Sequence, residues 1–297
     1  MESQVKKWQT FAVRQFQVLK DKMTASIEGP IMAISEIAGN LLDFGIPSEG
    51  QNSSKIDSFS FQIADRQKHY KMVHEAMCQV FSYQEPITRA VGASPSDVVQ
   101  FYHDICEGSF ESPLSILAFD KDRLAGFVLS YAKEMKYKSN SKPSRSFKLK
   151  KDYATEIATG PYPNRPSNQL IVFIEEVEKD LEIFLPRCKK YFKIDILFVH
   201  PNYTGRGLAK KLVEKALQLA AENNCQYVAT CATAKVSAHI FHKFGFTSVR
   251  EIPFSSFREN GQPVYSNLHD GNSSGKLMVL KLGSSVSSNG SIDVDLS

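Results

Sequence analysis

The sequence predicts an α/β fold, in which short strands alternate with amphipathic helices. Apolar runs of strand length alternate along the chain with stretches whose apolar residues recur at helical spacing. A glycine-rich segment, residues 205–209, separates one apolar strand from an amphipathic helix, an arrangement suited to binding an anion. The length of 297 residues is within the range of a single large α/β domain.

The composition is that of an ordinary globular protein and excludes several classes. Hydrophobic residues make up 42% and charged residues 23%, which excludes wholesale disorder, collagen and a disulfide mini-scaffold. The net charge of +4 is too small to indicate a nucleic-acid partner. No apolar run approaches the roughly 20 residues that span a bilayer, so no membrane segment is expected.

The five cysteines show no CxxC pair and no zinc-like spacing, so no metal site is predicted. The N-terminus lacks a secretory apolar core, and a reducing, cytoplasmic location is the default expectation. Three regions are expected along the chain. Residues 1–57 form a helical extension with a polar linker, residues 58–282 form the folded domain, and residues 283–297 form a Ser- and Gly-rich disordered tail.

The domain is expected to begin with a strand and two helices. Residues 59–63 alternate apolar and polar side chains, as a half-buried strand does. Asp65 is a good N-cap for a helix, which Glu85-Pro86 interrupts because the residue before a proline is pushed out of the helical region. Ser94 followed by Pro95 marks the start of the second helix.

A hairpin and a long polar segment follow. Residues 114–119 and 124–131 flank a polar turn, as the arms of a hairpin do. Residues 132–168 are polar and basic in their first half, which predicts a mobile loop, with substrate or phosphate steering as the alternative. The remaining expected elements are an acidic helix (168–186), a strand (191–199), a helix (205–224), a strand (226–230), a helix (236–244) and strands near 246–253 and 277–282.

The strand–turn–helix between Ile194 and Lys210 carries the strongest chemical signal. Gly205, Gly207 and Ala209 are small enough for a ligand to approach the backbone closely. The first amides of a helix have no partner within it, and together with the helix dipole they suit a pyrophosphate. The segment matches neither a Walker A loop nor a dinucleotide-binding fingerprint, and a tight turn without a ligand remains the alternative.

Two segments resemble motifs of the GNAT superfamily of N-acetyltransferases. IDILFVHPNYTGRGLAK (194–210) resembles motif A, and SAHIFHKFGF (237–246) resembles motif B at the right distance. The resemblance implies the GNAT fold, a mixed twisted sheet flanked by helices with an acyl-CoA cleft between splayed central strands. It also implies acetyl-CoA as co-substrate, held by Leu197, Phe198, Val199, Thr204, Gly205, Arg206, Gly207, Leu208, Ala209 and Lys210. Thr204 stands where the family has Arg or Gln.

A narrower resemblance concerns the insect-type arylalkylamine (dopamine) N-acetyltransferases. SYQEPIT (82–88) and EIPFSSFRENGQPVY (251–265) are similar to segments of that group. The resemblance implies that Glu85 is the general base and that Ser237 and Thr233 assist it. The tyrosine that many relatives use as general acid falls on Phe241 here.

The predicted reaction transfers an acetyl group from acetyl-CoA to a primary amine, such as an arylalkylamine. Only the free amine attacks a thioester, and a carboxylate can remove the proton of the ammonium form. Two alternatives stay open: an acyltransferase for another small amine or a longer acyl chain, and a non-catalytic acyl-CoA-binding regulatory protein. Without the resemblance, Glu85 would be interpreted as a surface turn residue and Ser237 as a helix cap. Aromatic candidates for the amine pocket are Phe81, Tyr83 and Phe101.

Overall fold

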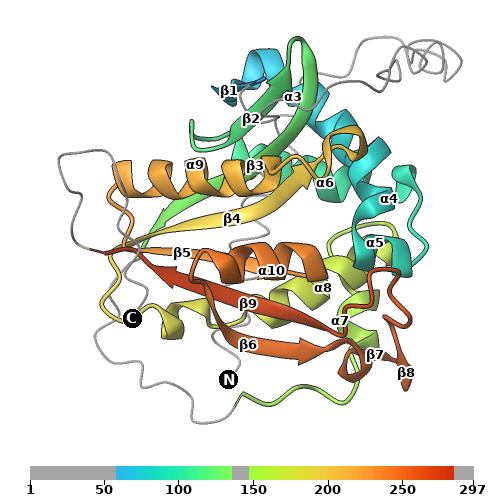
Figure 1. The fold of residues 1–297 in the computed structure, drawn as a ribbon. Helices are drawn as coiled ribbons and strands as arrows, with labels where there is room; N and C mark the ends of the chain where they lie inside the picture. Colours follow the sequence, from blue (N-terminus) through green and yellow to red (C-terminus); the bar gives the residue numbers. More distant parts are fainter. Residues whose placement is uncertain (1–57, 136–146, 284–297) are drawn as a thin grey trace, which may run out of the picture. The chain divides into compact units, whose positions relative to one another are not determined.

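The computed structural model describes residues 58–135 and 147–283, all within the unit Ser54–Ser297 (Figure 1). The predictions made for residues 1–57, for residues 136–146 of the basic segment and for the tail from residue 284 lie outside the described residues.

Seven strands form one mixed sheet in the order β1-β2-β3-β4-β5-β9-β6. The strands β4 and β5 are parallel, and the other neighbouring pairs are antiparallel. This confirms the predicted mixed sheet. The bounds are β1 Phe59–Ile63, β2 Ile116–Asp120, β3 Arg123–Glu134, β4 Lys190–Val199, β5 Tyr227–Ala232, β6 Thr247–Pro253 and β9 Ser274–Lys281. A separate short hairpin pairs β7 (Arg258–Glu259) with β8 (Gln262–Pro263).

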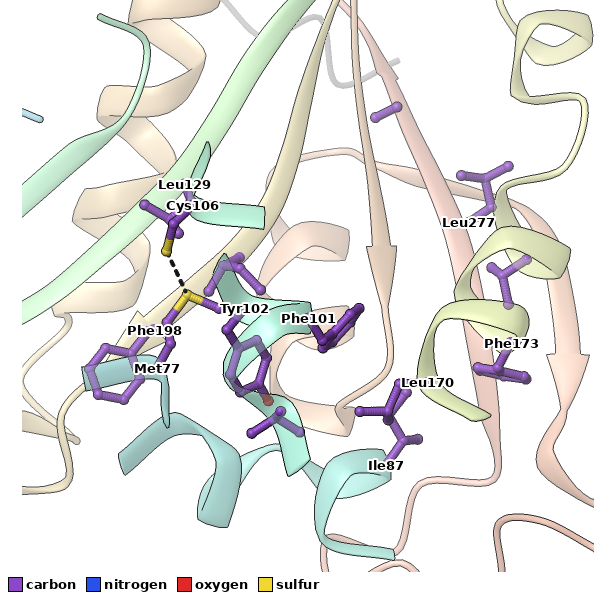
Figure 2. Close-up of a cluster of buried hydrophobic side chains, with 14 of the residues drawn as sticks. Met77, Ile87, Phe101, Tyr102, Cys106, Leu129, Leu170, Phe173, Phe198 and Leu277 are labelled. Atoms are coloured by element: carbon purple, nitrogen blue, oxygen red, sulfur yellow. Dashed lines mark hydrogen bonds between the residues drawn. The ribbon is translucent and has the colours of Figure 1, made fainter. Parts of the chain in front are cut away.

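Helices cover both faces of the sheet and enclose two apolar cores (Figure 1). On one face α9 (Leu208–Glu222) and α10 (Lys235–Lys243) bury residues such as Leu212 and Phe241. On the other face lie α3 (Arg66–Ala76), α6 (Pro95–Ser109) and α8 (Arg165–Glu178). In this second core the side chains of Tyr102, Cys106 and Phe198 gather around Met77, as Figure 2 shows. No helix within the described residues is long and apolar enough to cross a bilayer.

The remaining helical segments are short. They are a π-helical segment (Met77–Phe81), α4 (Ser82–Gln84), α5 (Pro86–Ala90), α7 (Ala154–Ala158) and three 3₁₀ turns (Leu181–Phe184, Pro201–Tyr203 and Phe254–Ser256).

The first predicted helix is confirmed at its start and at its end, but it is not a single regular α-helix. Asp65 is the N-cap, and its side chain accepts a hydrogen bond from the amide of Lys68. The helix continues as a π-helical segment and then as α4, and Glu85 stops it with an extended ψ of 120°. Glu85 then serves as the N-cap of α5, so Glu85-Pro86 both ends one helix and begins the next.

The prediction of a mobile loop over residues 132–168 is wrong for its described part. Strand β3 runs on to Glu134, and α7 lies inside the expected loop. Tyr153 is 1% exposed, with its ring 4.5 Å from that of Phe257, and its amide donates to the carbonyl of Arg258 at 2.7 Å. The sequence around Tyr153 is polar and gives no local sign of this packing, because the partner Phe257 lies about a hundred residues further along the chain.

Two helix boundaries also differ from the predictions. The acidic helix begins at Arg165 rather than residue 168. It ends at Glu178, because the next residue, Lys179, has an extended ψ of 132°. The helix after the glycine-rich turn begins at Leu208 rather than Gly205.

Candidate active site

The strands β4 and β5 separate part of the way along their length. Their parallel pairing runs from Tyr191 to Ile194 of β4 and stops there. On its other edge β4 pairs with β3 as far as Val199. Among the described strands, none pairs with the β5-facing edge of residues 196–199. This is the predicted splay between the central strands, and it leaves the backbone groups of Leu197, Phe198 and Val199 on that edge available to a ligand.

Strand β4 carries a bulge at the point of separation. Leu129 of β3 faces Ile196, whereas the next residue, Ser130, faces Ile194, so Asp195 is the extra residue. Further along, Gly126 lets β3 and β4 approach each other closely, since a Cβ there would lie 2.6 Å from the carbonyl oxygen of Phe198. The bulge therefore lies where the pairing of β4 with β5 ends.

The glycine-rich turn presents the N-terminus of α9 without a side-chain cap. Gly207 is the N-cap residue at a left-handed φ of 81°, and no side chain accepts from the first amides of the helix. The predicted residues Leu208, Ala209 and Lys210 form the first turn, and buried Leu208 anchors it. These uncapped amides fit the pyrophosphate of a CoA thioester.

Thr204, Gly205 and Arg206 lie in the turn before the helix. The hydroxyl of Thr204 donates to the carbonyl of Pro201 at 2.9 Å, so it stabilises the turn itself. The guanidinium of Arg206 lies 5.2 Å from the ring centroid of Tyr203 and donates to the carbonyl of Asn202 at 3.1 Å. Arg206 therefore carries a positive charge in this turn, which Thr204 does not.

Glu85 is a buried carboxylate with three hydrogen-bond donors. Its side chain is the N-cap of α5: Oε2 accepts from the amide of Thr88 at 2.6 Å and from its hydroxyl at 2.7 Å. Its other oxygen, Oε1, accepts from the hydroxyl of Thr233 at 2.8 Å. Glu85 is 9% exposed, so its interpretation as a surface turn residue is wrong.

The surroundings of Glu85 favour its neutral form. Burial raises the pKa of Glu85, and the hydrogen bonds from Thr88 and Thr233 only partly oppose this. Burial and the charge of Glu85 raise the pKa values of both Tyr102 and Tyr265 well above the usual range. A carboxylate in such surroundings accepts a proton more readily than an exposed one does.

The two predicted hydroxyl residues differ in position. Thr233, just beyond β5, contacts Glu85 directly. The hydroxyl of Ser237 donates instead to the carbonyl of Ala234 at 2.9 Å. Ala234 is the N-cap of α10, so the interpretation of Ser237 as the cap is wrong. Phe241 is buried, with its ring 5.1 Å from that of Phe246, and it belongs to the core.

The aromatic candidates divide in the same way. Tyr83 is 57% exposed, and Phe101 is a core residue. The ring of Phe81 lies between those of Tyr102 and Phe198, with centroid distances of 5.8 and 6.0 Å. Phe81 therefore contacts both α6, near Glu85, and strand β4.

Sequence reasoning missed three neighbours of Glu85. The spacing of Thr88, three residues after an N-cap, is a signal that could have identified it. Tyr102 lies on α6, 3.1 Å from the Thr88 hydroxyl, and buried Tyr265 donates to the carbonyl of Gln169 at 2.7 Å. No local pattern marks these two tyrosines, because tertiary packing alone brings them near Glu85.

The buried charge predicts a pH-dependent effect on stability. We expect Glu85→Gln to raise the melting temperature at about pH 8 but not at about pH 4, below the ordinary glutamate pKa. A carboxyl whose pKa is raised on folding costs stability as the pH rises from its unfolded to its folded pKa, and glutamine carries no such charge. Its amide can accept from Thr88 and donate to Thr233.

Thermal melts across this pH range test the expectation, with Glu251→Gln as control. Lys276 lowers the pKa of Glu251, so that substitution should bring no gain at high pH. A Glu85→Gln melting temperature below that of the wild type at pH 8 would mean that the carboxylate serves mainly as a helix cap.

Comparisons with known proteins bear on the fold. The structure is similar to arylalkylamine N-acetyltransferase 2 from Aedes aegypti, with 22% identity, coverage of 76% of this chain and 99% of that one, and a TM-score of 0.62. It is also similar to the Drosophila melanogaster polyamine N-acetyltransferase that forms N-acetylagmatine, with 16% identity, coverage of 75% and 100%, and a TM-score of 0.58. At these identities the likeness shows the fold.

The family assignment has its own evidence. The model of the acetyltransferase (GNAT) family matches residues 79–246, which include Glu85, the β4–α9 turn and α10. The match covers more than half of the 297 residues. Members of this family take the acetyl group from acetyl-CoA. The chain therefore belongs to the GNAT acetyltransferase family.

Proposed function

We propose that this chain transfers an acetyl group from acetyl-CoA to a primary amine of the arylalkylamine type, with Glu85 as general base. The observation that carries the proposal is the hydrogen bond from Thr233 to Oε1 of Glu85. It joins the carboxylate on α5 to the end of β5, beside the point where β4 and β5 separate. The base and the open strand edge therefore belong to one site.

The co-substrate acetyl-CoA carries its activated acetyl group as a thioester. Residues around the fork, the point where β4 and β5 separate, supply the groups that bind it. The uncapped amides of Leu208, Ala209 and Lys210 receive the pyrophosphate, and Arg206 adds a positive charge. The free backbone edge of residues 196–199 holds the pantetheine arm. Amides near Phe198 and Val199 polarise the thioester carbonyl.

Glu85 removes the proton from the ammonium form of the amine substrate. An alkylamine has a pKa near about 10.4 and is mostly ammonium at neutral pH. Two donors from Thr88 occupy Oε2, so Oε1 is the oxygen that takes the proton. Thr233, which donates to Oε1, forms the connection through which a proton returns to the leaving thiolate, directly or through water.

The aromatic groups near Glu85 favour an amine with a ring. Phe81 lies between Tyr102 and Phe198, and Tyr265 lies within electrostatic reach of Glu85. An aromatic ring packs well on such groups, whereas the carboxylate attracts the ammonium. The similar structures include N-acetyltransferases of arylalkylamines, polyamines and agmatine, so these amines define the panel to be tested.

Turnover of acetyl-CoA with that panel tests the proposal. Thiol release measures the rate, and mass spectrometry of the amine detects one added acetyl group. We expect acetylation of arylalkylamines with kcat/KM above that for the polyamines and agmatine. A preference for polyamines would overturn the substrate class. Acetyl-CoA binding without turnover of any amine would favour the non-catalytic alternative.

The two hydroxyl residues are expected to differ in their effect. Thr233→Val removes the donor to Oε1 while keeping the shape of the side chain. We expect kcat to fall about 10- to 100-fold, since a hydrogen bond to a charged group is worth about 1.5–3 kcal/mol. Ser237→Ala removes a bond to a backbone carbonyl and should lower kcat less than about 3-fold, because water can replace it. Steady-state kinetics of both variants measure this. Equal losses would contradict the assignment of Thr233.

A further inference from the structure

A buried lysine lies beside the candidate site and is not used in the chemistry proposed above. Lys193 on β4 is 1% exposed. Its ammonium pairs with Oδ1 of Asp195 at 2.9 Å and with Oε1 of Glu178, at the end of α8, at 2.7 Å. Both carboxylates keep about a quarter of their side-chain surface. The cluster therefore joins strand β4 to the helix layer.

The cluster lies at the bulge of β4. Asp195 is the extra residue of that bulge, and Lys193 lies two residues before it in β4. The Lys193 ammonium also lies 3.5 Å from the carbonyl oxygen of Ile194. Its contacts thus fall on both the bulge residue and the residue that precedes it, where the pairing with β5 ends.

Cys231 of β5 connects the cluster with Glu85, the proposed base. The thiol of Cys231 on β5 lies within electrostatic reach of Lys193, Asp195, Glu178 and Glu85. Burial alone would lower the pKa of Lys193, but Asp195 and Glu178 outweigh it and hold that pKa well above the usual range, so the ammonium stays charged.

Stability alone is a poor explanation for such a cluster. A buried ion pair often contributes no more stability than well-packed apolar residues of similar volume would, because desolvating the charges is costly. What Lys193 provides that an apolar residue would not is a directional bond to the side chain of the bulge residue.

We propose that Lys193 is a positioning residue, whose ammonium holds the Asp195 bulge so that the β4 amides beyond it point at the thioester carbonyl. The inference rests on the proposed function, since it assigns those amides to the carbonyl. Lys193 is close to Asp195 and Glu178 rather than to the reacting atoms, so it acts through the backbone of β4. The ion pair with Glu178 ties the Lys193 ammonium to the end of α8 and so fixes its position beside Asp195.

Kinetics of Lys193→Met provide the first test. An error of about 1 Å in placement can cost about 10²-fold in rate, so we expect kcat to fall about 10- to 100-fold. The affinity for acetyl-CoA should change less than about 3-fold, because the pyrophosphate binds at α9. Lys193→Arg should restore part of the rate. Lys276→Met, which breaks a 2.7 Å ion pair with Glu251 outside the site, should leave kcat unchanged.

An infrared measurement gives a readout that needs no amine. In isotope-edited difference spectra of [1-¹³C]acetyl-CoA, binding to the wild type should shift the carbonyl band to lower wavenumber. The shift should shrink in Lys193→Met and persist in Lys276→Met. If Lys193→Met does not fold, Asp195→Asn replaces it, since that change weakens the bond to the bulge and leaves Lys193 paired with Glu178.

The outcomes separate this inference from the proposed function. An unchanged kcat and an unchanged carbonyl shift in folded Lys193→Met or Asp195→Asn would overturn the positioning role. A carbonyl shift that is present in the wild type and reduced in Lys193→Met, without acetylation of any amine, would contradict the proposed function and support the positioning role. A wild type that binds acetyl-CoA without any shift would overturn both.

Discussion

Glu85→Gln is expected to lower kcat by about 10²–10⁴-fold at neutral pH, the usual cost of removing a general base. Glutamine keeps the size of the side chain and can still accept from Thr88 and donate to Thr233. The proton acceptor is what it lacks. Acetyl-CoA binds at the amides of α9, so its affinity should stay within about 3-fold of the wild-type value, and the loss should fall on kcat.

Two measurements keep this expectation specific. Calorimetry with acetyl-CoA shows whether the variant still binds the co-substrate. Glu251→Gln is the matched control, since it makes the same substitution in a carboxylate that pairs with Lys276 on the neighbouring strand. We expect its kcat to equal that of the wild type. A Glu85→Gln variant as active as Glu251→Gln would leave Glu85 with only its capping role.

Gly207→Glu is expected to weaken acetyl-CoA binding by at least about 10²-fold. The new carboxylate would stand at the N-cap of α9, where the uncapped amides and the helix dipole favour a pyrophosphate, and it would both repel that anion and cap the amides itself. The left-handed φ of 81° adds strain of about 1–2 kcal/mol for any residue with a Cβ. Isothermal calorimetry of the folded variant measures the effect.

Two further variants separate charge from strain. Gly207→Ala introduces the strain without the charge and should weaken binding far less than Gly207→Glu. Gly261→Glu places a glutamate at a similar φ of 78° in the turn between β7 and β8, where a Cβ meets no atom within 4 Å. It should bind acetyl-CoA as the wild type does. Equal binding by Gly207→Glu and Gly261→Glu would mean that the anion binds elsewhere.

Local signals predicted the frame of the site. The apolar run before residue 199 and the glycines after it predicted β4, the turn and α9, because strand, turn and helix preferences agree there. Asp65 and Ser94 marked their helices correctly, since each caps through its own side chain. Where a helix starts at Leu208 rather than Gly205, the difference is the left-handed conformation of two glycines, which sequence alone does not fix.

The chemistry inside the frame depends on contacts across long stretches of chain. Pairing Glu85 with Thr233 required a family resemblance, because 148 residues separate them. Tyr265 reaches the same region through packing against α8 and had no signal of its own. Lys193 lies in a predicted strand that also carries Asp195, and nothing in that pattern marks the lysine as buried. Its partner Glu178 lies in the predicted acidic helix, and only the packing of α8 against the sheet brings the two side chains together.

The pH dependence of kcat/KM for the wild type and Glu85→Gln tests the central claim most directly. Between about pH 6 and pH 10 the fraction of free amine rises steeply, so the need for a base falls. We therefore predict that the ratio of wild-type to Glu85→Gln activity is large at the low end of this range and shrinks steadily as the pH rises. Two profiles that overlay, or that differ by a constant factor at every pH, would contradict the role of Glu85 as the base that deprotonates the amine.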